Sequence, residues 1–599
     1  MGILDIIPTL IPLAIVGGIA YAIYAWRKRA LDSDANHDPG MGTLKRLYFY
    51  GISFAALMTL VAGISLAVQS LLNVLFDGAA FSLSSNELAW GLSLLIVALP
   101  IWFFHWRFIL RSVAAMPVES RSIIRKVYIY LTLGVALGFL AAVSYEILKW
   151  AMRAGEFPEF SLASILPWAM IWGYHWQIES AEGQRSMETR GIRRLYLYAA
   201  SLVGGGMFAV GVGAMVHTLL QDGYSALFLT QVTISDQAGV ARESLRTDLS
   251  IAIVGGAMYW THWHRFALDD RNSILRWIAL FIASVGGAAT ALGSVGVMAS
   301  TTLSWLLGGA NERAALHFED MPGVLVVASA GVIAWALFRR RMLIEAVGEY
   351  ATPVRRIYDH LMAAFGLTAL SGASFVIFNT ALATFAEALS VSITDSDAWR
   401  SPVAAILAML LIGVPVWGYY WRRLRLAYAT DSESEATALS HRVYIFAILG
   451  AGALAFLGGG GGTLFVILRD LLDAALSVET LRDLTPAIGF ALTSALFLPY
   501  HWAIYRADQA YQPDESEPSA VSKRVTILVA DGDSALTQTI EDALGYPIRQ
   551  AHWSDPEAFA PTLDEEQAAR IADEISQSSG SNVLLIPHEV AGLKVISYD

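Results

Sequence analysis

The feature that most constrains the fold is a series of long apolar runs that fills most of the chain. The first covers residues 6–26, and similar runs recur until about residue 506. A helix needs about 20 mostly apolar residues to cross the hydrocarbon core of a membrane. Only 15% of the 599 residues are charged and 55% are hydrophobic, which excludes a soluble globular enzyme, a disordered chain and a coiled coil. The sequence therefore predicts an all-α polytopic membrane protein.

The apolar runs begin and end with recurring phrases. A basic residue and a tyrosine open the outgoing run, and an aromatic phrase closes the returning run. The opening tyrosines are Tyr48, Tyr128, Tyr196, Tyr358 and Tyr444, with Ile278 in one weaker copy. The closing tryptophans are Trp106, Trp176, Trp263, Trp421 and Trp502, and four of them follow His105, His175, His262 and His501. Phrases that recur at the same ends of apolar runs predict six tandem two-helix hairpins. With the first helix, they give about 13 transmembrane helices.

The distribution of Lys and Arg predicts the orientation. Loops at the ends that carry the tyrosine and His–Trp phrases hold 27 basic residues, and the opposite loops hold 8. Cytoplasmic loops are the basic ones. Residues 6–26 are preceded by Asp5 and followed by Arg27, the reverse of a cleavable signal peptide, so this helix is expected to be permanent. We expect the N-terminus outside and the C-terminus in the cytoplasm.

The repeated histidines and aromatic residues allow two interpretations. Neutral imidazole binds metals and titrates near neutrality, so His105, His175, His262 and His501 are candidates for haem ligation or a proton relay. The alternative is an aromatic belt at the membrane interface, where tyrosine and tryptophan place a polar tip beside an apolar body. Cofactors of helical bundles lie between facing helices, whereas these histidines lie at helix ends. We therefore predict the belt, with tyrosine–histidine hydrogen bonds inside each hairpin, no cofactor and no metal. The predicted interfacial residues are Tyr48, Trp106, Tyr128, Trp176, Tyr196, Trp263, Tyr358, Trp421, Tyr444 and Trp502.

Glycine runs lie at residues 204–206, 286–287 and 458–462, within outgoing helices. In a membrane, glycine lets helices approach closely, which is the interpretation favoured here. A broken helix lining a transporter site stays open as the alternative. The chain has no cysteine, which excludes disulfides and thiolate catalysis, and neither HExxH nor a P-loop pattern is present.

A small soluble α/β domain is predicted at the C-terminal end. Strands are expected at residues 525–530, 548–552, 583–586 and 593–597, and helices at 534–544 and from the Thr562–Glu565 capping pair to about 576. From residue 520 onward the chain has 13 acidic and 5 basic residues. This excess of acid favours a protein partner with a basic surface, and no basic groove for nucleic acid is present.

The paired phrases resemble a bacterial family of multi-pass membrane domains catalogued as domain of unknown function 5671. Residues 100–106 and 415–421 carry the resemblance best, and the fourth hairpin departs from both phrases. The resemblance implies three tandem domains of two hairpins each, a bacterial plasma membrane, and no assigned activity. The predicted domains are an N-terminal transmembrane helix (1–30), three repeat domains (41–180, 190–341 and 352–508), a linker (509–522) and the soluble domain (523–599).

Residues 525–536 also resemble the opening of a response-regulator receiver. A receiver needs an acceptor aspartate at the end of a later strand, where this chain has Ile586 and Pro587. We therefore expect a domain that binds a partner and cannot be phosphorylated on aspartate. For the whole chain, the leading hypothesis is a non-enzymatic membrane scaffold or sensor that contacts the lipid bilayer. A transporter or channel is the second hypothesis, and a haem or redox protein is the third.

Overall fold

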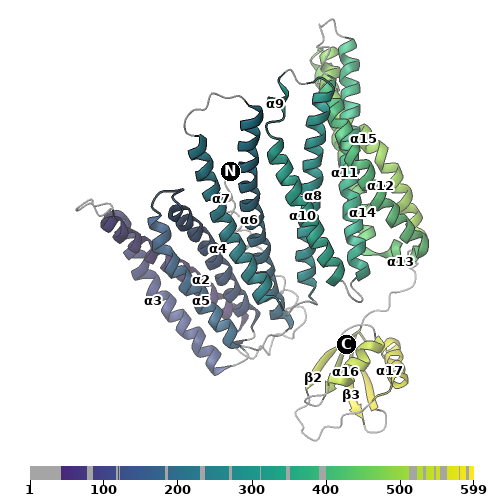
Figure 1. Ribbon diagram of the computed structural model, residues 1–599. Helices are drawn as coiled ribbons and strands as arrows, with labels where there is room; N and C mark the ends of the chain where they lie inside the picture. Colours follow the sequence, from purple (N-terminus) through teal and green to yellow (C-terminus); the bar gives the residue numbers. More distant parts are fainter. Residues whose placement is uncertain are drawn as a thin grey trace. The chain divides into compact units, whose positions relative to one another are not determined.

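The chain divides into two compact units, Met1–Ile504 and Tyr505–Asp599. The computed structural model describes residues 42–76, 85–116, 119–120, 122–182, 187–229, 237–268, 273–309, 312–345, 351–389, 399–511, 523–529, 534–544, 548–552, 563–578, 580–588 and 592–598. The predicted first helix, residues 6–26, lies outside these ranges. Figure 1 shows long helices in the first unit and a small sheet with two helices in the second.

The long helices form six consecutive hairpins, as the repeated phrases predict. Their members are α2 (Thr43–Phe76) with α3 (Ser85–Ala115), α4 (Ile123–Ala151) with α5 (Glu159–Glu182), α6 (Met187–Phe228) with α7 (Gln237–Tyr259), α8 (Ile274–Leu306) with α10 (Met321–Glu345), α11 (Ala351–Ala388) with α12 (Arg400–Thr430), and α14 (Leu439–Leu472) with α15 (Val478–Asp508). Short turns of helix accompany them: η2 (Trp260–Phe266), α9 (Ala314–His317), α13 (Ser432–Thr437) and η4 (Gln509–Tyr511). Among the described residues, ten helices are long and apolar enough to cross a membrane, and α5 and α7 are not among them.

The outgoing helices pack against one another in chain order. Contacts join α2 to α4, α4 to α6, α6 to α8, α8 to α11 and α11 to α14. Each returning helix from α3 to α12 packs mainly against its own outgoing partner. We call α2–α5, α6–α10 and α11–α15 the first, second and third hairpin pairs.

Each glycine run places at least one glycine directly against the returning helix of its own hairpin. A Cβ atom at Gly204 of α6 would lie 2.7 Å from the backbone nitrogen of Tyr259, and one at Gly459 of α14 would lie 2.6 Å from the carbonyl oxygen of Ala487. Both α6 and α14 continue as helices through their glycine runs. These contacts support the close-packing interpretation over a broken helix.

The second unit is a four-stranded sheet with two helices. The strand order is β2 (Arg549–His552), β1 (Arg524–Val529), β3 (Asn582–His588), β4 (Gly592–Tyr598), with β4 antiparallel to β3 and the other pairs parallel. Helices α16 (Ser534–Leu544) and α17 (Glu565–Gln577) share one hydrophobic core with β1 and β3. The predicted order of strands and helices is confirmed.

Two details of this unit differ from expectation. The cap of α17 is Asp564 with Gln567, which form a capping box, rather than Thr562 with Glu565. In a capping box, the side chain of the N-cap residue accepts a hydrogen bond from the backbone N–H of the third helical residue. The side chain of that third residue accepts a hydrogen bond from the backbone N–H of the N-cap residue. The antiparallel β4 departs from the parallel sheet of receiver-type doubly wound folds. Ile586 and Pro587 lie inside β3, and Asp531 and Asp533 lie outside the described residues.

Candidate functional site

The opening tyrosine of a hairpin lies against the closing histidine of the same hairpin. The hydroxyl of Tyr128 is 3.3 Å from Nε2 of His175, and that of Tyr196 is 3.1 Å from Nε2 of His262. These two hydrogen bonds were predicted from the repeat. The same positions approach as ring pairs in other hairpins: Tyr48–His105 at 5.6 Å, Tyr358–Tyr420 at 6.0 Å and Tyr444–His501 at 6.0 Å between ring centroids.

The other ring nitrogen of each histidine bonds to its own helix. Nδ1 lies within hydrogen-bond distance of the carbonyl four residues earlier in His105 (2.7 Å), His175 (2.9 Å), His262 (2.8 Å) and His501 (3.0 Å). A carbonyl only accepts, so Nδ1 donates and Nε2 is the acceptor in the neutral ring. In His175 and His262, Nε2 accepts from tyrosine, so haem ligation there would first have to displace a tyrosine hydroxyl.

Tryptophan–tyrosine hydrogen bonds connect successive hairpins at this end. Each indole N–H donates to a tyrosine hydroxyl of the following hairpin. Two bonds lie inside a hairpin pair, Trp106 to Tyr174 (2.7 Å) and Trp421 to Tyr500 (2.6 Å). Two join adjacent pairs, Trp172 to Tyr196 (3.0 Å) and Trp335 to Tyr358 (2.6 Å). The two bonds inside hairpin pairs occupy equivalent repeat positions, and so do the two bonds between pairs, so two kinds of polar contact alternate along the row.

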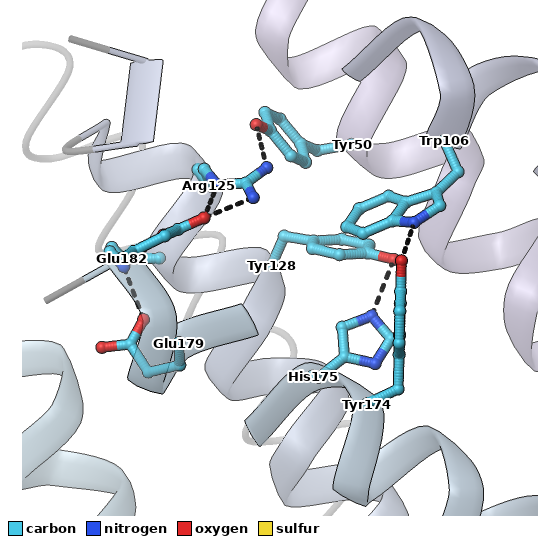
Figure 2. A network of polar contacts seen from close by, with 9 residues as sticks. Tyr50, Trp106, Arg125, Tyr128, Tyr174, His175, Glu179 and Glu182 are labelled. Atoms are coloured by element: carbon cyan, nitrogen blue, oxygen red, sulfur yellow. Dashed lines mark hydrogen bonds and ion pairs between the residues drawn. The ribbon is translucent and has the colours of Figure 1, made fainter. Parts of the chain in front are cut away.

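A buried acid–base network reinforces the first hairpin pair (Figure 2). Nη2 of Arg125 lies 2.5 Å from Glu182, and its Nη1 lies 3.2 Å from the hydroxyl of Tyr50. Lys126 places Nζ 2.5 Å from Glu179 and 2.6 Å from Glu182. Arg125 and Lys126 are each 1% exposed, so both charges depend on these partners. Two cations and two carboxylates leave the cluster with no net charge.

A further ion pair recurs at equivalent positions in the first and third hairpin pairs. Arg46 binds the fully buried Glu119 through Nε and Nη2, and Arg356 binds Glu435 at 2.8 Å. Both glutamates stand nine residues before an opening tyrosine, in the connection between the two hairpins of a pair. Each arginine therefore fixes the connection that leads into the next hairpin.

The second hairpin pair has an ion pair like the one between Lys126 and Glu182, but the residues around it differ. Arg276 binds Glu345 at 2.7 Å, in the repeat positions of Lys126 and Glu182. Its guanidinium lies 4.5 Å from the ring centroid of Trp263. This tryptophan belongs to η2, a π-helical turn, which is an irregularity often found at functional positions.

The predicted interfacial residues are mostly buried between helices. Seven are less than 9% exposed: Trp106, Tyr128, Tyr196, Trp263, Tyr358, Trp421 and Tyr444. Trp176 is half-buried, whereas Tyr48 and Trp502 are more than half exposed. The buried side chains therefore act as helix–helix contacts, and their depth in a membrane stays a prediction.

The repeated phrases alone do not predict the carboxylates of this network. They lie beyond the ends of the apolar runs, where a carboxylate is usually solvated: Glu119, Glu179, Glu182, Glu345 and Glu435. The sequence does hold one signal for these carboxylates, which is a constant number of residues between a glutamate and a repeated phrase. Glu182 and Glu345 both stand seven residues after the position of the closing histidine.

Other features of the first unit offer less chemistry. In the ranges that the structure describes, no three His, Asp or Glu side chains group in a way that could hold a metal ion. An apolar groove of about 460 Å³ lies between α6 and α7, lined by residues such as Phe208, Val212, Leu249 and Ile253. The polar network at the helix ends is therefore the strongest candidate site.

Tandem hairpins of long apolar helices, locked by repeated polar contacts at one end, are typical of a polytopic membrane protein built from internal repeats. The family described as Domain of unknown function (DUF5671) matches residues 46–174, 194–332 and 380–496. These three matches cover more than half of the chain, which therefore belongs to this family, as the repeated phrases predicted. No curated protein and no solved structure matches the chain significantly.

Proposed function

We propose that the protein is a non-enzymatic scaffold or sensor of the bacterial plasma membrane, with a C-terminal unit that binds a protein partner in the cytoplasm. One observation carries this proposal. Tyrosine–histidine or tryptophan–tyrosine hydrogen bonds, together with ion pairs, join the helix ends in every hairpin pair. Groups that are used to hold helices together are not disposed to act on a reactant.

The energetics of the network support a structural role. A buried charge without a partner costs several kcal/mol, whereas a paired and hydrogen-bonded charge is tolerated. Arg46 with Glu119 and Arg356 with Glu435 repeat the same pairing in different hairpin pairs. A row of hairpins fixed in this way is suited to hold a soluble unit at the membrane.

The C-terminal unit supplies the proposed contact surface. Helix α17 turns Ala568, Ile571 and Ile575 into the core. Its Glu566 and Glu574 are exposed. The acidic excess of this unit favours a basic protein surface and opposes binding to anionic lipid headgroups.

Affinity purification of the full chain in mild detergent tests the partner proposal. The partner should be captured by the unaltered chain and lost with Glu566→Lys/Asp573→Lys/Glu574→Lys, because the reversed charges repel a basic surface. A matched control, Asp222→Lys/Glu243→Lys, alters exposed acids near the end of α6 and the start of α7, which are predicted to lie outside, and should capture the partner normally. Equal capture by all three chains would refute the proposed surface.

The topology is proposed to comprise 13 spans, with residues 6–26 as the first. Reporter fusions after Asp77 and after Asp508 should give opposite results, outside and inside, because the basic loops face the cytoplasm. A short tag inserted at the same positions of the full-length chain serves as the control, because it does not truncate the protein. If both positions report the same side, the hairpin topology is wrong.

The histidines are proposed to act as hydrogen-bonding residues rather than as haem ligands. Purified protein should lack a Soret band, and His175→Ala should leave the visible spectrum unchanged, since Nε2 of His175 already accepts from Tyr128. The visible spectrum of protein expressed with added haem precursor is the measurement. A Soret band that His105→Ala or His175→Ala removes would support the redox hypothesis instead.

A transporter is the second proposal. Parallel repeats are one transporter architecture, and the groove between α6 and α7 could take an apolar molecule. The glycine runs that suggested a broken helix lie in continuous helices, so we place this function after the scaffold or sensor.

A further inference from the structure

Two junctions between hairpin pairs are built on the same hydrogen bond. Between the first and second pairs, Trp172 donates to Tyr196, and between the second and third pairs, Trp335 donates to Tyr358. We call these contacts the first and the second junction. Because the bonded residues are equivalent in the repeat, the residues at equal distances from them along the chain can be compared directly.

The first junction is closed largely by apolar packing. Trp176, four residues after the donating tryptophan, has its ring centroid 4.3 Å from that of Phe266. Leu197, which follows the opening tyrosine, is fully buried. Nη2 of Arg193 lies 3.2 Å from the backbone carbonyl oxygen of Phe266, so this arginine is also bonded within the junction. The first junction is thus completed by its own residues.

The second junction has charged residues at two of these positions. Arg339 of α10 stands in the position of Trp176. Asp359 of α11 stands in the position of Leu197, and it is only 5% exposed. Oδ2 of Asp359 lies 3.1 Å from Nη2 of Arg423 on α12. A buried carboxylate and an additional arginine are therefore present in a contact that the first junction makes with apolar side chains.

Positive charge exceeds negative charge at the second junction. Asp359 interacts electrostatically with three arginines, which are Arg423, Arg355 and Arg339. We call these four residues the junction cluster. In the part of the chain that the structure describes, Arg423 is the one arginine of the cluster that forms an ion pair, and its partner is Asp359. One carboxylate among three guanidinium groups leaves two positive charges without compensation.

Two atoms of the junction cluster are buried without a hydrogen-bond partner among the described residues. They are Nε of Arg339, which is a donor, and Oδ1 of Asp359, which is an acceptor. The guanidinium carbon of Arg339 lies 5.9 Å from the ring centroid of Trp335 and 5.8 Å from that of Tyr358. These rings stabilise the charge of Arg339 but do not accept from its Nε. A buried polar atom without a partner is costly, so a ligand that supplies an acceptor and a donor would complete the cluster.

We propose that the junction cluster binds a phosphate group through Arg339, Arg355 and Arg423, while a neighbouring hydroxyl group of the ligand donates to Oδ1 of Asp359. Guanidinium groups bind phosphate oxygens through parallel, charge-assisted hydrogen bonds. Two uncompensated positive charges match the charge of a phosphate ester.

The ligand has two potential sources with this chemistry. Basic pockets between membrane helices on the cytoplasmic side bind phospholipid headgroups, and the helix ends that carry the cluster are predicted to face the cytoplasm. A soluble phosphate compound would reach the same helix ends from water. The site goes beyond the proposed scaffold or sensor function, because it does not involve the C-terminal unit that is proposed to bind a partner.

Lipid retention by the full chain tests the proposal and distinguishes the two sources. Purified protein in an uncharged detergent is mixed with phosphatidylglycerol, which has an anionic phosphate and free hydroxyl groups, and native mass spectrometry counts the lipid retained. Phosphatidylcholine, which has no net charge and no hydroxyl group, should be retained less. Inorganic phosphate is tested in the same detergent by thermal unfolding, because a ligand of the folded chain raises the unfolding temperature.

The two arms have distinct outcomes. Preferential retention of phosphatidylglycerol without an effect of inorganic phosphate supports a site for a lipid headgroup. A higher unfolding temperature in inorganic phosphate, lost with Arg339→Gln, supports a site that soluble phosphate compounds occupy. Equal retention of both lipids together with no effect of inorganic phosphate would overturn the phosphate site.

Matched variants locate the binding at the junction cluster. Arg339→Gln should weaken binding by about tenfold to a hundredfold, which is the usual effect of losing a hydrogen bond from a charged group. Arg340→Gln removes the same charge from the exposed neighbouring residue and should change binding by less than about threefold. Unfolding temperatures measured without added ligand show that each variant is folded.

A double variant uses the first junction as its template. Arg339→Trp/Asp359→Leu gives the second junction the residues of the first, so it should fold and lose the preference for phosphatidylglycerol or phosphate. Equal binding by Arg339→Gln and Arg340→Gln, or a folded double variant that keeps the preference, would overturn the proposed site.

Discussion

Glu119→Leu is expected to lower the free energy of unfolding of the helical unit by about 3–5 kcal/mol, because it removes the buried carboxylate that neutralises the charge of Arg46. The carboxylate of Glu119 is fully buried and accepts from Nε and Nη2 of Arg46 at 3.0 and 2.8 Å. Arg46 is 9% exposed, so water replaces little of the lost interaction. The substitution also releases the connection between the first two hairpins.

A double-mutant cycle shows whether the loss comes from the pair. Arg46→Met/Glu119→Leu should recover most of the stability, because apolar side chains of similar volume often replace a buried ion pair at little cost. Glu146→Gln is the matched control, since its partner Lys149 is 25% exposed and the pair lies on the surface of α4. A double variant as unstable as Glu119→Leu would show that the Arg46–Glu119 pair is not the source of the effect.

Denaturant titration of the full chain in detergent micelles is the measurement. Tryptophan fluorescence reports almost entirely on the helical unit, because Trp553 is the only one of 18 tryptophans that follows residue 504. Unfolding of the C-terminal unit therefore adds little to the signal, and the transition can be assigned to the hairpins.

The sequence predicted the hairpins well because the repeated phrases mark the physical ends of the helices. Tyr128 and His175 were expected to meet, since an opening and a closing phrase at the same level must face each other across a hairpin. The same reasoning could not predict the bond from Trp172 to Tyr196, because that bond depends on which hairpins are neighbours and on the rotation of each helix. Neither quantity follows from periodicity along one helix.

The acid–base network shows a second limit of the sequence pattern. A glutamate just beyond an apolar run normally marks a solvated helix end, and Glu182 has that position in the sequence. Its contacts with Arg125 and Lys126 arise because α4 begins at the level where α5 ends. For the small unit, the alternation of short strands and helices predicted the order of elements. The short connection between β3 and β4 also accounts for the antiparallel direction of β4, because parallel neighbours need a crossover of about a dozen residues or more.

Gly204→Ala is expected to destabilise the helical unit by about 1–3 kcal/mol, although alanine favours a helix, because the added methyl group overpacks the contact with α7. Its Cβ atom would lie 2.7 Å from the backbone nitrogen of Tyr259 and 3.0 Å from the carbonyl oxygen of Gly255. Backbone atoms cannot rotate away as a side chain can, so relief requires α6 and α7 to separate along part of their length.

Gly206→Ala, two residues further along the same helix, is the matched control for this effect. No atom lies within 4 Å of a Cβ atom at that position, so the variant should be as stable as the parent chain or gain up to about 1 kcal/mol of helix propensity. Thermal unfolding of the two variants, followed by tryptophan fluorescence, compares them. A broken helix that lines a site would need flexibility at both glycines and would be disturbed by both substitutions. Close packing requires glycine only where the neighbouring helix touches, so equal losses at Gly204 and Gly206 would overturn the packing interpretation and restore the transporter hypothesis.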